Sequence, residues 1–214
     1  MRRVNKILVT AFCLAAVPIP ALADTPNATG SGSAGAVDLT TGGQITHQDP
    51  IAPCAVGTTA TSSSSPLVVG TRTRFGSATT SCKRNADSTA SVSVSGERFE
   101  TTVLAPYGGP AIKVKTFKAS CDTTENGSRG QIQLGGVSGV SVPSNIPANY
   151  TVTIPGPTPS SPPIAAVVLN ELITPNPPDG SLTSHPVHIR LFPQGGPASG
   201  DIFVGTVACN PDEW

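Results

Sequence analysis

Hydrophobic and polar residues alternate with a period of two along much of this chain. In residues 88–96 apolar residues alternate with serines, and residues 67–75 show a similar pattern with Gly70 at a bulge. This period places apolar side chains on one face of a strand and polar ones on the other. After the N-terminal leader no segment has the 3.6-residue period of an amphipathic helix. The pattern therefore predicts an all-β domain.

Glycines and polar residues mark the joints between the predicted strands. Gly42 and Gly43 separate two short strands at residues 36–40 and 44–48, which predicts a hairpin with a two-residue turn. The serine-rich residues 60–66 are predicted to form a loop.

Residues 167–209 contain the clearest succession of strands. They read as VVLNELI, then TSHPVHIRLF, then GDIFVGTVAC, with proline- and glycine-rich joints. We expect a β-hairpin and a return strand here, within an antiparallel β-sandwich-like domain that has Pro/Gly-rich loops. Val187, Ile189, Ile202 and Val204 are predicted to be buried in it.

The N-terminus has the three parts of a secretory signal peptide. Three basic residues come first, an apolar run follows over residues 7–18, and Ala-Leu-Ala at 21–23 is a small-residue cleavage site. The apolar run is shorter than the about 20 residues that span a bilayer. We therefore expect residues 1–23 to be removed on export, and no stable membrane span after cleavage.

The remaining chain is predicted to consist of a short lead-in and one domain. Residues 24–35 are small and polar, which favours a flexible lead-in. Residues 36–210 are predicted to form a single all-β domain, with a subdivision near residues 105–111 left open.

The charge and the motif content argue against several classes of function. The chain has 13 basic and 13 acidic residues, and without the three basic residues of the leader the net charge is 10 − 13, or −3. Nucleic-acid binding relies on clustered Lys and Arg, so we expect no nucleic-acid partner. Clustered Cys and His ligands, phosphate loops and nucleophile motifs are missing from the sequence. We expect no catalytic residues, no metal and no cofactor.

Four cysteines follow the leader: Cys54, Cys82, Cys121 and Cys209. An even number in an exported chain favours two disulfides, for which three pairings exist. We favour Cys54 with Cys82 and Cys121 with Cys209, because each pair then ties together one portion of the chain. Cys209 ends the last predicted strand, which we expect at the edge of a sheet.

Several segments in the second half of the chain resemble a known family. They are KASC (118–121), LGGVSGV (134–140), VVLNE (167–171), DGSLTSHPVHIRL (179–191) and GDIFVGTVAC (200–209). In order and spacing, residues 117–209 resemble the choice-of-anchor P family of exported actinobacterial proteins. The resemblance implies a secreted all-β domain, often held at the cell surface, with no established biochemical activity. It also supports the pairing of Cys121 with Cys209.

A candidate polar cluster lies in the same region. Asn170 and Glu171 precede the predicted hairpin and can approach His188 or Arg190 across paired strands. Such a group suits acid/base chemistry or a cation site. Polar cross-strand pairs also fix the register of a hairpin, and we favour this structural role. His185 is three residues from His188, which on a regular strand places the two rings on opposite faces, poorly suited to sharing a metal.

Three functions are consistent with these features. We favour a secreted, non-catalytic β-domain of the cell envelope that acts in surface interaction or structure, with a cell-wall or surface glycan or protein as its partner. The alternative is a carbohydrate- or glycan-binding module, which would be favoured by an exposed coplanar pair of aromatic rings. A hydrolase is the third, and it would need a pocket that joins Glu171 to a second acid. The aromatic candidates are Tyr107, Tyr150, Phe192, Phe203 and Trp214.

Mass spectrometry of the native protein tests the predicted export. We expect the mature chain to begin at Asp24, because signal peptidase cleaves after small residues such as those at 21–23. A cytoplasmic protein that retains Met1 would contradict this interpretation of residues 1–23.

Overall fold

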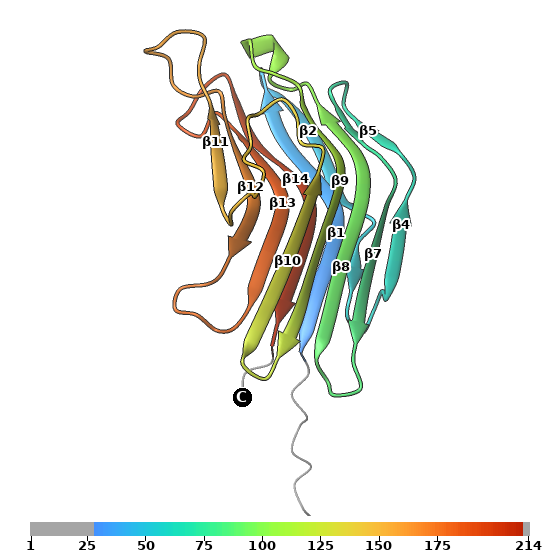
Figure 1. Ribbon diagram of the computed structural model, residues 1–214. Helices are drawn as coiled ribbons and strands as arrows, with labels where there is room; N and C mark the ends of the chain where they lie inside the picture. Colours follow the sequence, from blue (N-terminus) through green and yellow to red (C-terminus); the bar gives the residue numbers. More distant parts are fainter. Residues whose placement is uncertain (1–27, 212–214) are drawn as a thin grey trace, which may run out of the picture.

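The computed structural model describes residues 28–211, so the predicted signal peptide and residues 24–27 lie outside the described residues. The chain forms two antiparallel sheets that pack face to face (Figure 1). A single 3-10 turn, η1 (Ala105–Tyr107), is the one helical element among residues 28–211. The prediction of an all-β, sandwich-like domain is confirmed. No helix within this range is long and apolar enough to cross a membrane.

The first sheet, sheet A, has the strand order β11-β12-β13-β14-β1-β2, with β3 paired to β1. It therefore joins the first strands of the chain to the last ones. Its strands are β1 (Thr29–Thr41), β2 (Gln44–Ile51), β3 (Cys54–Ala55), β11 (Tyr150–Ile154), β12 (Ala165–Ile173), β13 (Leu182–Leu191) and β14 (Ala198–Asn210).

The second sheet, sheet B, is built from the middle of the chain. Its main order is β10-β9-β8-β6-β5, and β7 also pairs with β8 and carries β4 on its other side. Its strands are β4 (Thr61–Ser64), β5 (Leu67–Val69), β6 (Thr73–Phe75), β7 (Ala78–Arg84), β8 (Ala90–Thr101), β9 (Ile112–Thr124) and β10 (Gly127–Gly135).

The core lies between the two sheets and is mostly aliphatic, with Phe75, Phe99 and Phe117 among its buried side chains. The residues predicted to be buried from the alternation in β13 and β14 are in it, because Val187, Ile189, Ile202 and Val204 have no exposed surface. Val92 of β8, in sheet B, is buried in the same core with 1% of its surface exposed. The burial of these aliphatic side chains supplies the main driving force for folding.

The predicted lead-in is wrong for residues 29–35, which form the first half of β1. This strand lies between β14 and β2 in sheet A. A Cβ atom at Gly30 would lie 2.6 Å from a methyl carbon of Val92, and one at Gly32 would lie 3.0 Å from the other methyl. A glycine-rich segment can therefore be an interior strand, because the opposite sheet fills the space that side chains would take.

Two short segments also differ from the sequence-based predictions. The predicted loop at residues 60–66 contains β4, whose serines pair with β7. Residues 67–75 are not one strand but a hairpin of β5 and β6, which turns at Gly70 with a φ of +59°. Residues 105–111, where a subdivision was left open, connect β8 to β9, and these strands are neighbours in sheet B.

Both disulfides connect one sheet to the other, with the pairing favoured from the sequence. Cys54 of β3 is bonded to Cys82 of β7, and Cys121 of β9 is bonded to Cys209 of β14. The expectation that the last strand is an edge strand is wrong, because β14 lies between β13 and β1. Its sequence position at the end of the chain does not determine its place in the sheet.

Serine substitutions test the relative contributions of the two disulfides. The double variant C121S/C209S should lower the urea midpoint of unfolding more than C54S/C82S, because its bridge spans 88 residues of sequence and the other spans 28. Chain-entropy arguments give contributions of about 4.5 and about 3.5 kcal/mol respectively. Each double variant is the control for the other. A larger loss in C54S/C82S would contradict the argument from loop length.

Candidate functional site

The alternation of inward and outward side chains changes phase in the middle of β13. Leu182 packs toward sheet B, and Ser184, Val187 and Ile189 are buried as well. Two residues, Pro186 and Val187, separate His185 from His188, whereas a regular strand has one residue between side chains on the same face.

The change of phase crosses four strands of sheet A at one level. The register on either side of this level aligns Asn170 of β12 with Pro186 of β13. It also aligns Pro186 with Gly205 of β14, and Gly205 with Ala34 of β1. Asn170 and Gly205 have positive φ angles of +53° and +70°. The inward positions on either side are Leu169 and Leu172 in β12, Val204 and Val207 in β14, and Gly32 and Gly35 in β1.

This irregularity places two histidines on the same outer face of sheet A. The ring centroids of His185 and His188 are 6.1 Å apart, and the residues are only 7% and 4% exposed. The expectation that the two rings lie on opposite faces is wrong. It assumed regular alternation, which fails at Pro186.

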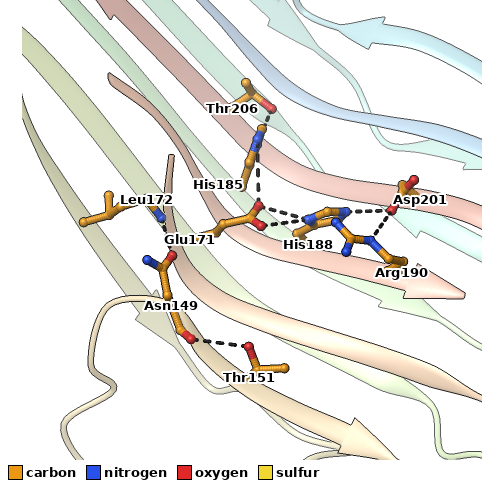
Figure 2. A network of polar contacts seen from close by, with 9 residues as sticks. All are labelled: Asn149, Thr151, Glu171, Leu172, His185, His188, Arg190, Asp201 and Thr206. Atoms are coloured by element: carbon orange, nitrogen blue, oxygen red, sulfur yellow. Dashed lines mark hydrogen bonds and ion pairs between the residues drawn. The ribbon is translucent and has the colours of Figure 1, made fainter. Parts of the chain in front are cut away.

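His188 lies at the centre of a polar cluster formed by three adjacent strands (Figure 2). Its Nδ1 is 2.9 Å from Oε2 and 3.0 Å from Oε1 of Glu171 on β12. Its Nε2 is 2.7 Å from Oδ1 of Asp201 on β14. Phe203 stacks on the imidazole with a centroid distance of 4.4 Å. Arg190 completes the cluster, because its Nε donates to Oδ1 of Asp201 over 3.4 Å.

His185 occupies the side of the cluster next to the change of phase. Its Nδ1 is 3.0 Å from Oγ1 of Thr206, and its Nε2 is 3.9 Å from Oε2 of Glu171. Its ring also lies against Phe203, with centroids 4.7 Å apart. One aromatic side chain therefore covers both imidazoles.

The environment shifts the pKa values of three of these groups. Burial by itself would lower the pKa of His188, but hydrogen bonds to Glu171 and Asp201, and their charges, raise it above its ordinary value. Burial lowers the pKa of His185 more than the charge of Glu171 raises it. Burial would raise the pKa of Glu171, but the hydrogen bond and charge of His188 lower it. The surroundings therefore favour the charged forms of Glu171 and His188 and the neutral form of His185.

Three of the four residues predicted to form the cluster belong to it. Glu171 and His188 are in direct contact, and Arg190 reaches His188 through Asp201. Asn170 does not take part, because its Nδ2 donates to the carbonyl oxygen of Ile146 over 2.7 Å. It connects β12 to the segment that precedes β11.

Sequence reasoning missed Asp201, Thr206 and Phe203. The register of the β13–β14 hairpin pairs Arg190 with Asp201 and His188 with Phe203. Counting outward from the turn between these strands could therefore have found Asp201 and Phe203. Thr206 had no such signal, because it lies beyond the change of phase.

The described residues do not provide the exposed coplanar aromatic pair that would favour a glycan-binding module. Tyr107 and Phe192 form an edge-on pair with centroids 4.8 Å apart, and Tyr150 packs against the core. No coplanar pair of exposed aromatic rings is therefore found among residues 28–211, and Trp214 lies outside this range. Within the same range no group of three or more His, Cys, Asp or Glu side chains is arranged to hold a metal ion.

Comparison with known proteins finds no family model, no curated protein and no solved structure that matches this chain.

The pH dependence of unfolding tests the charge state of His188. Its raised pKa contributes stability that is fully present below the unfolded-state pKa of about 6.5 and is lost as the pH rises through the folded-state value. Glu171 and His185 have lowered pKa values, so their contributions are lost only as the pH falls. The unfolding free energy of the native protein should therefore decline above about pH 6.5.

The variant H188Q should remove this alkaline decline. At about pH 6 it should also be about 1.5–3 kcal/mol less stable, which is the range for a hydrogen bond to a charged group. The control is H47Q, because His47 is exposed on β2 and pairs with Asp49 outside the cluster. Urea titrations across the pH range give the result. An alkaline decline that persists in H188Q would contradict the assignment.

Proposed function

We propose that this protein is an exported, non-catalytic β-domain of the cell envelope that acts in surface interaction or structure. The observation that carries the proposal is the closed polar cluster around His188. Both ring nitrogens of this residue lie within 3.0 Å of carboxylate oxygens of Glu171 and Asp201. An imidazole whose two ring nitrogens are both hydrogen-bonded to carboxylates has no ring nitrogen left to exchange a proton with a substrate.

The cluster has a structural task that accounts for its residues. Glu171, His188 and Asp201 come from β12, β13 and β14, so one imidazole connects three adjacent strands. It does so next to the positions where these strands depart from regular alternation. Charge-assisted hydrogen bonds there stabilise the register of a sheet that would otherwise be prone to slip.

Two further observations support export. Two disulfides connect the sheets, and such bonds persist mainly in oxidising compartments outside the cytoplasm. The resemblance of residues 117–209 to exported actinobacterial proteins points to the same location, and so does the signal-peptide pattern of residues 1–23.

Sedimentation with cell envelopes tests the proposed function. The mature protein, residues 24–214, is mixed with envelope fragments of the producing organism, and the pellet is analysed. We expect the protein in the pellet. The variant H188Q should sediment equally at a temperature where it remains folded, because the cluster stabilises the fold and does not bind the partner.

Two outcomes would contradict the proposal. One is a native protein found in the cytoplasm and absent from both envelope and medium. The other is release of soluble products from the envelope by the native protein but not by folded E171Q, which would indicate a hydrolase.

A further inference from the structure

A broad groove lies on the outer face of sheet B, on the opposite side of the sandwich from the polar cluster. It has a volume of about 680 Å³ and crosses β4, β7, β8, β9 and β10, which lie side by side in Figure 1. A second hollow of about 450 Å³ continues it along the face and shares Ser63, Thr79, Ser95 and Lys118 with it.

The strand register aligns the side chains of this groove in two rows. Each row takes one residue from each of the five strands. The first row is Ser63, Thr79, Ser95, Lys118 and Gln133, and the second is Thr61, Ser81, Ser93, Ser120 and Gln131. Nine of the ten side chains are uncharged hydroxyls or amides.

The dimensions of this array follow from sheet geometry. Five strands at about 4.8 Å spacing make each row roughly 19 Å long, and positions two residues apart set the rows about 6.8 Å apart. The next row at one end contains the charged residues Lys83, Asp122 and Arg129 beside Ser91, and the next row at the other end contains Glu97 beside Thr116 and Gly135. The neutral array is therefore long across the strands and narrow along them.

Most polar groups of the array are free to bind a ligand. Thr79 and Ser95 share one hydrogen bond of 3.0 Å. Within the part of the chain that the structure describes, the side chains of Ser93, Gln131 and Gln133 form no hydrogen bond. The ammonium group of Lys118 forms no ion pair with any of the residues 28–211.

We propose that this groove binds a neutral polysaccharide whose chain runs across the strands. The inference rests on the proposed function and names the class of its ligand. Sugar hydroxyls both donate and accept hydrogen bonds, as do the hydroxyls and amides of the two rows. A row that crosses five strands matches an extended polymer better than a small molecule.

Other partners fit the lining less well. A protein partner would use buried aromatic or aliphatic anchors, whereas the large exposed apolar residues Ile45, Val68 and Ile173 all lie outside the groove. A nucleic acid or an acidic glycan would use clustered cations, whereas Lys118 is the one charged residue of the lining. The array also has no aromatic ring for stacking, so binding depends on many hydrogen bonds.

Affinity electrophoresis tests the proposal with the neutral polysaccharides amylose, laminarin and galactomannan and with the acidic polygalacturonate. We expect retardation by at least one neutral polymer. The double variant Q131A/Q133A should bind it about tenfold more weakly, which corresponds to the loss of about two neutral hydrogen bonds. The variant S93E, which adds bulk and charge at the centre of the second row, should abolish the retardation.

The matched control is Q44A/Q48A, which removes two glutamines from β2 in sheet A and should bind like the native protein. Thermal unfolding of each variant verifies that it is folded. Retardation by polygalacturonate alone, retardation that the groove variants leave unchanged, or none by any polymer would overturn the inference. If the native protein and S93E sediment equally with envelopes, the proposed function stands and the groove is not its site.

Discussion

The change of phase that crosses sheet A at Asn170, Pro186, Gly205 and Ala34 is the constraint on which the polar cluster depends. With regular alternation, His185 and His188 would face opposite sides of the sheet. Each of these neighbouring strands has one extra residue at this level. The apolar side chains therefore point inward both before and after the irregular positions. The extra residue also directs both imidazoles outward.

The two outer faces of the sandwich differ in how their polar groups are satisfied. On sheet A, long charged side chains reach across β12, β13 and β14 and bind one another, which leaves His188 only 4% exposed. On sheet B, the groove residues of β7 and β8 are short hydroxyls, and among them only Thr79 and Ser95 bond to each other. The first face is closed by its own contacts, and the second leaves donors and acceptors open to a ligand.

Small residues and disulfides hold the two sheets together around a core of aliphatic side chains and buried phenylalanines. Glycines of β1 let sheet A approach Val92 and Phe75 of sheet B closely. Two disulfides then connect the sheets at separate places. The polar cluster adds hydrogen bonds at the one level where the strands of sheet A are least regular.

The sequence by itself determined the all-β class, the buried face of β8 and of the C-terminal strands, and three members of the cluster, because these follow from local alternation. Only the tertiary structure decided that residues 29–35 form an interior strand, that β14 is not an edge strand, and that His185 joins His188. Each of these depends on a partner far away in the chain: Val92 against Gly30, β1 beside β14, and Gly205 opposite Pro186. Alternation within one strand carries no information on such partners, since strand pairing and sheet packing join residues that are remote in sequence.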